Sequence, residues 1–553
     1  MRDWFRWSLG ALLCVAASSF AATISDDALR VAIEQGGVQR IVLNGSLAVT
    51  APPSPGKWRQ GLYQIAAYPP AAGSLALSPL RSRSISQSSG VVTVADHFDQ
   101  LSAAYDWSLH GNDLNERITI QNFSDRPYGD PIMIALPSFS FSGKVGGNLC
   151  DWTADYVAFN QSFHPSVWMP LAAQYAYDAT WGLCMYSPSR IARPTLFTKT
   201  VTRVGSGEVS AITFYAKESV PPKQTDRIDI TIRITPQSAD VDLSNLLASY
   251  IRDYQAAAGP LRYVPDDRPL VQFVSFDTGH VTPTDPLGYN GANRRLDQIE
   301  GVWGFERMVA PSESVTAGTI FWQPQGVNPR GVQYRPDFDV WPGLIALPDG
   351  QVSDVQANLP RLIRWYHQHH LRFGLCARPE DYIVAASAKT DRTEHLDVAN
   401  APEMARLLAR FDHMNQFGVD LYYLDSFGAD LNSVAMMKQI RTRLGPNVPT
   451  YSEMTSDLML PYSGVYSQTT DPPRADGSTT WYSPETFRIF RLLQPHCSIL
   501  LTGINNSSGG PIYTVSQLGH WKMTPMVEDF LVRRYVLYFR DLQRDYMVNG
   551  QWK

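Results

Sequence analysis

The sequence lacks most of the signatures that identify a protein's class at once. The 553 residues carry a formal net charge of −5 and contain no run or patch of Lys and Arg. A nucleic-acid partner is therefore not expected, because such proteins gather positive charge on one face. The chain also lacks an HExxH motif, a P-loop and a GxGxxG after a strand, and no GxSxG elbow lies near a candidate histidine. We expect no metal, no cofactor and no serine-hydrolase triad.

Cysteine is scarce, and none of the five cysteines forms a CxxC pair. Beyond the N-terminal segment the chain has Cys150, Cys184, Cys376 and Cys497. Three of these lie in or beside apolar strand-like runs, where buried free thiols are common. An oxidising compartment would permit a disulfide between Cys150 and Cys184, and the sequence leaves that pairing open.

Long apolar runs are also missing, since no stretch approaches the roughly 20 residues that a membrane-spanning helix needs. The N-terminus has Arg2 and Arg6, a short apolar run over 7–17 and a small-x-small site at 19–21. This order is typical of a signal peptide, so we predict that residues 1–21 are removed. We expect a periplasmic or secreted protein whose mature chain has no membrane span.

Residues 22–260 have the pattern of an all-β domain. Short runs of alternating polar and apolar residues recur, as at 114–120 and 227–234, and turn clusters separate them. Many short strands with regular turns predict a sandwich or barrel, and the length favours a large sandwich. A helix is expected over 243–257, and the Gly-Pro pair that follows it places the domain boundary near residue 260.

Residues 261–553 alternate between strand and helix signals. Expected strands lie at 270–276, 318–322, 372–378, 464–468, 498–502 and 512–515, with two more ending at Asp425 and Glu453. Expected helices lie at 359–370, 402–417, 433–444 and 525–546. Such alternation predicts parallel strands joined by crossover helices, and the length suits a (β/α)₈ barrel. The predicted fold class is therefore an N-terminal β-sandwich followed by a TIM barrel.

Two carboxylates each follow a short apolar run in the barrel region. Asp425 and Glu453 are 453 − 425 = 28 residues apart, and an expected helix lies between them. This is the length of one strand–helix–strand unit, so both side chains should lie on the carboxyl-end rim of the barrel, where barrel enzymes have their active sites. Paired carboxylates on such a rim are typical of glycoside hydrolysis.

The spacing of the strands suggests roles for the two carboxylates. Adjacent strands lie about 4.8 Å apart, which suits the roughly 5–5.5 Å carboxyl separation of retaining glycosidases. The short, stiff Asp425 is assigned as nucleophile. Glu453 is longer and lies among apolar neighbours that would raise its pKa, so it is assigned as acid/base. The structural alternatives are a helix-capping Asp425 and a solvated or salt-bridged Glu453.

Five further residues are candidates for substrate binding because they lie at or near the expected strand ends. They are Asp277, Trp322, Arg378, Tyr423 and Asp457. Structural roles compete with this interpretation: a turn for Asp277, barrel packing for Trp322 and an ion pair for Arg378. For Asp457 the alternatives are orientation of the acid and helix capping.

The segments Tyr423-Leu424-Asp425-Ser426-Phe427-Gly428 and Tyr451-Ser452-Glu453-Met454 carry a resemblance to a known group. The chain resembles retaining glycoside hydrolases with an N-terminal galactose-mutarotase-like supersandwich and a (β/α)₈ barrel, such as endo-α-N-acetylgalactosaminidases and α-galactosidase-like enzymes. The resemblance implies an Asp nucleophile after the fourth strand, here Asp425, and a Glu acid/base after the fifth, here Glu453. It also implies a carbohydrate substrate.

We therefore predict an exported enzyme that hydrolyses an oligo- or polysaccharide by a retaining mechanism. The fourth-strand Asp favours α-linkages. The alternatives are a non-catalytic carbohydrate-binding protein on a barrel scaffold, and an inverting hydrolase or a polysaccharide lyase. The sequence does not decide the sugar, endo or exo action, or the oligomeric state.

Overall fold

The structure is a computed structural model. It describes residues 21–34, 37–50, 61–64, 80–127, 132–135, 139–142, 173–177, 179–188, 197–204, 208–217, 220–273, 315–321, 363–377, 379, 381–387, 390–425, 427, 431–453, 455–468, 484–504, 510–528 and 531–553. The chain forms two compact units; the second contains Leu243–Lys553 and two short earlier segments, and the first contains the rest. The predicted domain boundary near residue 260 stays a prediction.

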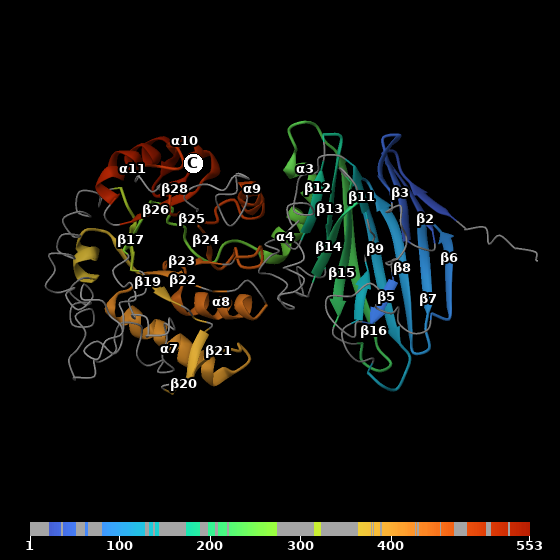
Figure 1. Ribbon diagram of the computed structural model, residues 1–553, viewed down its shortest axis with the longest axis horizontal. Helices are drawn as coiled ribbons and strands as arrows, with labels where there is room; N and C mark the ends of the chain where they lie inside the picture. The colour runs from blue at the N-terminus through green and yellow to red at the C-terminus, as the bar shows by residue number, and fades with distance from the viewer. Residues whose placement is uncertain are drawn as a thin grey trace, which may run out of the picture. The chain divides into compact units, whose positions relative to one another are not determined.

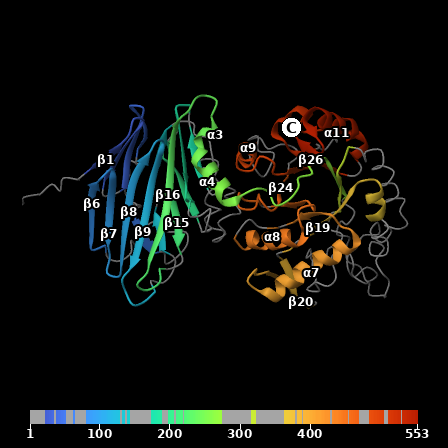
Figure 2. The same cartoon turned by 180° about the vertical axis from the view of Figure 1, so that it is seen from behind.

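The first unit contains two antiparallel sheets, seen from opposite sides in Figures 1 and 2. Among the described residues, nine strands form one sheet: β1 (Ala22–Ser25), β2 (Leu29–Glu34), β3 (Gly37–Leu43), β4 (Ser46–Thr50), β5 (Gly61–Gln64), β10 (Ile132–Ala135), β11 (Phe139–Ser142), β14 (Phe197–Val204) and β15 (Glu208–Lys217). Their order is β1-β2-β3-β4-β11-β15-β10-β5, and β14 also pairs with β15.

Seven described strands form the other sheet: β6 (Ser82–Ser88), β7 (Val91–His97), β8 (Leu101–His110), β9 (Asp113–Asn122), β12 (Ala173–Tyr177), β13 (Trp181–Tyr186) and β16 (Thr225–Pro236). Their order is β12-β13-β16-β9-β8-β7-β6. Side chains alternate along β8, where Leu101, Ala103, Tyr105 and Trp107 are buried and their neighbours are more exposed. Because β1 contacts β7 and β8 and β3 contacts β16, the two sheets pack against each other, and the predicted sandwich is confirmed.

The second unit contains a closed barrel of parallel strands, which confirms the predicted barrel fold. In the described part of the unit, the order follows the sequence: β17 (Leu270–Phe273), β18 (Gly318–Phe321), β19 (Arg372–Ala377), β22 (Leu421–Leu424), β23 (Thr450–Ser452), β24 (Gly464–Gln468), β25 (Ile499–Thr502) and β26 (Thr524–Glu528). Hydrogen bonds between β26 and β17 close the ring.

The helices of this unit are α3 (Leu243–Leu246), α4 (Ala248–Ala258), α7 (Ala401–Phe417), α8 (Leu431–Leu444), α9 (Pro484–Leu493), α10 (Val515–Trp521) and α11 (Val532–Tyr546), and residues 363–368 are also helical. Two small sheets pair β20 (Asp381–Ser387) with β21 (Thr390–His395) and β27 (Met547–Val548) with β28 (Gln551–Trp552).

The helix α7 shows how local sequence sets an element's ends. The Asn400 side chain accepts from the Glu403 N–H at its start, and Gly418 ends it with a φ of 98°, a left-handed conformation that glycine adopts without strain.

The prediction of the eighth strand was wrong. Residues 512–514 precede α10, which begins at Val515, and the eighth strand is β26, within the segment predicted to begin the last helix. Thr514 is the N-cap of α10 and forms a capping box with Gln517, so its apolar neighbours belong to a helix start. Pro525 suggested a helix start as well, but the segment 524–527 is buried throughout, as is usual for a strand covered on both faces.

Cys184, Cys376 and Cys497 are buried free thiols. Cys184 therefore forms no disulfide with Cys150, which lies outside the described residues. Within the described residues, no helix combines the length and apolar character needed to span a membrane.

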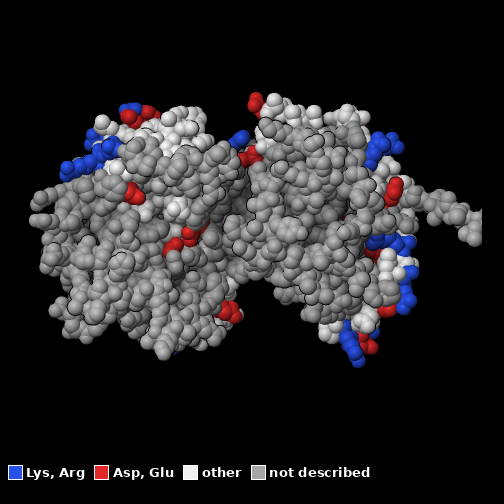
Figure 3. Space-filling view, in the orientation of Figure 1, with Lys and Arg blue, Asp and Glu red and all other residues white. Residues whose placement is uncertain are grey.

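Exposed basic side chains gather over α11 (Figure 3). Arg533, Arg540 and Arg544 follow one stripe of this helix and are exposed, as is Leu537 between them. Arg544 forms ion pairs with Asp541 and Asp545. The positive charge of this helix is therefore partly balanced by carboxylates of its own last turns.

Candidate active site

The register of β22 and β23 places Asp425 beside Glu453. The two strands pair Tyr423 with Tyr451 and Leu424 with Ser452, so Asp425 and Glu453 are the next residues along each strand. Both still take part in the ladder, since the Asp425 N–H donates to the Ala377 carbonyl at 2.7 Å and the Glu453 N–H donates to the Leu424 carbonyl at 3.2 Å. The two predicted catalytic residues are thus lateral neighbours at the carboxyl ends of adjacent parallel strands.

Side-chain alternation directs both carboxylates toward the barrel axis. Tyr423 and Tyr451 belong to the cluster that fills the barrel, whereas Leu424 belongs to the core between strands and helices. Asp425 and Glu453 lie two residues after the tyrosines and therefore share their inward direction. Asp425 is 6% exposed and Glu453 is half-buried. Both lie where a ligand at the barrel mouth would meet them.

Two tyrosines lie directly beneath the carboxylates. The Tyr423 hydroxyl donates to Asp425 Oδ1 at 3.3 Å, and the rings of Tyr423 and Tyr466 are 4.3 Å apart between centroids. Burial raises the pKa of both hydroxyls well above the usual range, and the charges of Asp425 and Glu453 raise it further. Both carboxylates are therefore close to both phenols, which stay protonated and able to donate hydrogen bonds.

The polar floor of the site extends to residues that the sequence analysis missed. Tyr466 forms hydrogen bonds with the side chains of Tyr423 and Thr502, and Thr502 Oγ1 donates to Gln272 Oε1 at 3.0 Å. Tyr466, Thr502 and Gln272 lie at inward positions near the ends of β24, β25 and β17. Strand alternation counted from Leu270 and Leu500 would have identified Gln272 and Thr502, and Tyr466 belongs to the same barrel cluster as those two leucines.

The loop after β23 is closely bound to the rest of the unit. Thr455 Oγ1 donates to the Ser452 carbonyl at 2.9 Å, and Asp457 is only 1% exposed. The Asp457 carboxylate accepts a hydrogen bond from the Tyr250 hydroxyl. Substrate contact by Asp457 is therefore not supported by its position, whereas its alternative role of orienting the loop that carries Glu453 agrees with these contacts.

Asp277, Trp322 and Arg378 lie outside the described residues, so their predicted contacts with substrate stay predictions. The alternative role of Asp425 as a helix cap does not agree with the structure, because α8 begins at Leu431, too far along the chain. Among the residues that the structure describes, no group of three or more His, Cys, Asp and Glu side chains could hold a metal ion.

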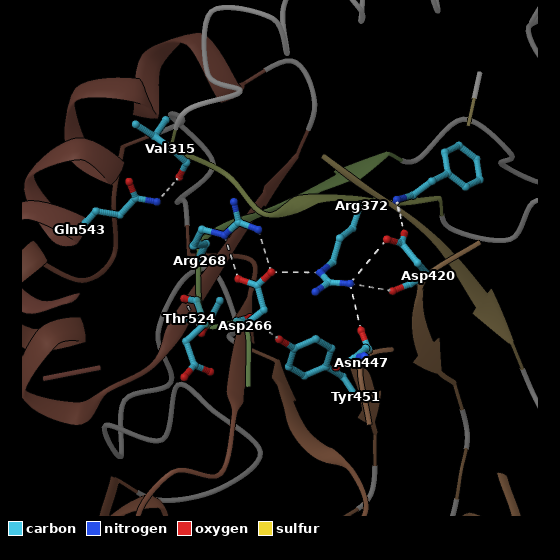
Figure 4. Close-up of polar contacts among 11 residues, drawn as sticks. Asp266, Arg268, Val315, Arg372, Asp420, Asn447, Tyr451, Thr524 and Gln543 are labelled. Atoms are coloured by element: carbon cyan, nitrogen blue, oxygen red, sulfur yellow. Dashed lines mark hydrogen bonds and ion pairs between the residues drawn. The ribbon is translucent and has the colours of Figure 1, made fainter. Parts of the chain in front are cut away.

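Carboxylates also lie at the opposite rim, where the strands begin, but arginines neutralise them (Figure 4). Arg372 reaches Asp266 at 3.0 Å and Asp420 at 3.5 Å, and Arg268 pairs with Asp266 at 2.8 Å. Burial alone would raise the pKa of the Asp266 carboxyl, but hydrogen bonds and charges from Arg268 and Arg372 lower it below the usual value. These carboxylates are bound within the protein and join the starts of several strands.

Comparison with known proteins gives matches among solved structures only. No protein-family model matches the chain, and no curated protein sequence matches it. One similar structure is a quadruple mutant of the α-N-acetylgalactosaminidase NagBb from Bifidobacterium bifidum, with 11% identity and a TM-score of 0.61 over 95% of this chain and 93% of that chain. The GalNAc complex of the same enzyme matches at 11% identity with a TM-score of 0.59, over 91% and 88%.

A variant of the GH36 α-galactosidase AgaA from Geobacillus stearothermophilus, in complex with 1-deoxygalactonojirimycin, matches at 10% identity over 95% of this chain and 86% of that chain, with a TM-score of 0.46. At these identities the likeness to NagBb shows a shared fold. It extends over both units of the chain, in agreement with the resemblance inferred from the two carboxylate motifs.

Proposed function

We propose that this protein is a glycoside hydrolase whose catalytic pair is Asp425 and Glu453. The observation that carries the proposal is the register of β22 and β23, which makes two inward-facing carboxylates neighbours at the end of the barrel where barrel enzymes act. Hydrolysis of a glycosidic bond needs two carboxyl groups, one on each side of the bond. One donates a proton to the leaving oxygen, and the other stabilises the positive charge that develops on the sugar.

The strand spacing favours a retaining mechanism, because adjacent strands about 4.8 Å apart bring short side chains to about the 5–5.5 Å of retaining enzymes. Asp425 attacks the anomeric carbon while Glu453 protonates the departing glycosidic oxygen, and a covalent glycosyl ester forms. Glu453, now ionised, takes a proton from water as the water attacks the same carbon and releases Asp425. The hydrogen bond from the Tyr423 hydroxyl to Asp425 Oδ1 holds the nucleophile in position for this attack.

The substrate proposed is an oligo- or polysaccharide with α-linked sugars. The fourth-strand position of Asp425 supports this choice, as does the shared fold with an α-N-acetylgalactosaminidase. The N-terminal segment supports export to the periplasm or the medium, where such polymers are met. α-N-acetylgalactosaminides and α-galactosides are therefore the first substrates to test.

The decisive experiment compares the wild type with Asp425→Asn and Glu453→Gln on 4-nitrophenyl α-glycosides. Loss of the nucleophile should lower kcat by at least about 10³-fold. Asp412→Asn is a matched control, because it removes a partly exposed carboxylate whose ion-pair partner is Arg443. Proton NMR of the first-formed sugar separates retention from inversion. A product that absorbs in the ultraviolet through a new double bond would indicate a lyase instead.

A non-catalytic carbohydrate-binding role is the second candidate. It would be favoured if the wild type bound glycans and cleaved none of the panel, and if the two variants bound them equally well.

A further inference from the structure

We propose that Asp457 is a positioning residue for Glu453, and that α4 supplies the anchor through Tyr250 and Tyr254. The inference rests on the proposed function, since it concerns the group that would protonate the leaving oxygen. A helix that precedes the barrel in sequence would thus control the geometry of a proton donor inside the barrel mouth.

The anchor is a buried carboxylate with each of its oxygens engaged. The Tyr250 hydroxyl donates to Asp457 Oδ2, and the N–H of Leu458 donates to Oδ1 at 2.8 Å. The Tyr254 hydroxyl donates to the Asp457 main-chain carbonyl at 2.7 Å. Side chain and main chain of the same residue are therefore held at once, which fixes both its position and its orientation.

The two tyrosines form one rigid face of α4. They are four residues apart and so lie on the same side of the helix. Both are fully buried, and their rings lie 6.1 Å apart between centroids. Burial raises the pKa of the Tyr254 hydroxyl well above its usual value, so it remains a donor throughout the range in which the protein is folded.

The chain between the anchor and Glu453 is short and internally bonded. Thr455 Oγ1 donates to the Ser452 carbonyl at 2.9 Å, and the Met459 N–H donates to the Ser456 carbonyl at 2.9 Å. Asp457 follows Glu453 by four residues, so a shift of the anchor is transmitted to the carboxyl group. Catalytic groups tolerate little displacement, because a shift of about 1 Å costs on the order of 10²-fold in rate.

The position of the anchor predicts which step it affects. Asp425 is held by the β19–β22 ladder and by Tyr423, so it should keep its place when the loop after β23 loosens. Glu453 also has a ladder bond, from its N–H to the Leu424 carbonyl at 3.2 Å, but its main chain continues into the anchored loop, so its carboxyl group should be the one that moves. The loss should therefore fall on protonation of the leaving group and spare nucleophilic attack, a distinction that general destabilisation of the fold would not produce.

The test uses the full-length protein and the variants Tyr250→Phe and Asp457→Asn. Each is assayed on a pair of α-glycosides, 4-methoxyphenyl and 2,4-dinitrophenyl, of which only the first needs protonation as it leaves. We expect kcat/KM, which reports the step in which the leaving group departs, to fall about 30-fold on the first and less than about threefold on the second. Equal losses in kcat/KM on both glycosides would overturn the proposal. Tyr538→Phe is the control, since it likewise removes one tyrosine hydroxyl with a hydrogen bond, here to the Tyr513 main-chain carbonyl.

Hydrogen–deuterium exchange provides a readout that does not depend on turnover. In Tyr250→Phe, amides of residues 455–463 should exchange at least about tenfold faster, while those of β22 and α8 keep their wild-type rates. Unchanged exchange in the loop would overturn the anchoring. If the wild type cleaves no glycoside but the loop still loosens, the anchor stands and the proposed hydrolase function fails, so the two failures are distinguishable.

Discussion

The two ends of β22 each carry an aspartate, and the two aspartates lie in different chemical surroundings. Asp420, before the strand, accepts a hydrogen bond from the Phe373 N–H at 2.9 Å and lies 3.5 Å from Arg372. Asp425, after the strand, accepts from the Tyr423 phenol and lies near a second carboxylate. The same residue type, five positions apart, thus serves the fold at one end and faces a prospective ligand at the other.

The difference follows from what each rim must do. At the amino end, Asp266 and Asp420 form ion pairs with arginines of the protein, so their charges are already balanced without a ligand. At the carboxyl end, two carboxylates are brought together over phenols, an arrangement that would stabilise the positively charged transition state of the proposed reaction. Under the proposed function, the barrel would separate stability from chemistry along the length of one strand.

The largest expected effect is a difference between Asp425 and Asp420, with the first needed for activity and the second for stability. Asp425→Asn should lower kcat by at least about 10³-fold and leave the free energy of unfolding within about 1 kcal/mol of wild type. Asp420→Asn should leave kcat close to that of the wild type and lower the free energy of unfolding, because its partners are structural. Urea unfolding and initial rates on the same preparations check both. Comparable loss of activity in the two folded variants would contradict the division.

The next effect concerns the amino-end rim. Arg372→Ala removes the shared partner of Asp266 and Asp420 and should lower the free energy of unfolding by about 3 kcal/mol, since two partly buried carboxylates lose a cation and only Asp266 keeps an arginine, Arg268. Arg443→Ala is the control, because its pair with Asp412 is largely exposed and should contribute less than about 1 kcal/mol. Urea titrations of both variants measure the contrast. Equal destabilisation would show that the rim network has no special role.

The pH dependence of stability should reveal a smaller effect at the same rim. Burial raises the pKa of Asp267 to about 7, although the charge of Arg491 opposes it. The folded state then holds a proton that the unfolded state has released, so stability falls as pH rises from about 4 to about 7, by at most about 1.4 kcal/mol per pH unit. Asp267→Asn should abolish this fall.

Asp266, next to Asp267, provides an internal contrast. Its pKa is lowered in the folded state, so its contribution is present above the unfolded pKa of about 3.9 and is lost as pH falls further. Thermal unfolding followed from pH 3 to pH 8 separates the two contributions. A wild-type curve that is flat between pH 4 and pH 7 would contradict the assignment of Asp267.

The smallest effect belongs to the phenol beneath the nucleophile. Tyr423→Phe removes the hydrogen bond to Asp425 Oδ1, which should loosen the position of the nucleophile and lower kcat about tenfold. Initial rates on the same α-glycosides measure the loss. Tyr422→Phe is the control, because its hydroxyl bonds Asn415 on the helix side of the same strand. An unchanged kcat in Tyr423→Phe would mean that Tyr423 acts only in packing.

Local patterns predicted much of this protein correctly. The helix α7 begins and ends where Asn400 and Gly418 lead one to expect, and the strands at 464–468 and 499–502 agree with their apolar runs. Such elements depend on neighbours in sequence. The eighth strand was misplaced because residues 524–527 are buried by contacts with β25 and β17, which no local pattern contains.

By itself the sequence determined the fold class, a sandwich followed by a barrel, because side-chain alternation and strand–helix alternation are properties of the chain alone. It also determined that Asp425 and Glu453 end consecutive strands. Only the tertiary structure decided that Tyr466, Thr502 and Gln272 complete the floor, and that Asp457 is buried against Tyr250. These contacts join segments up to 230 residues apart, and they form only when the barrel closes and α4 packs against the loop after β23.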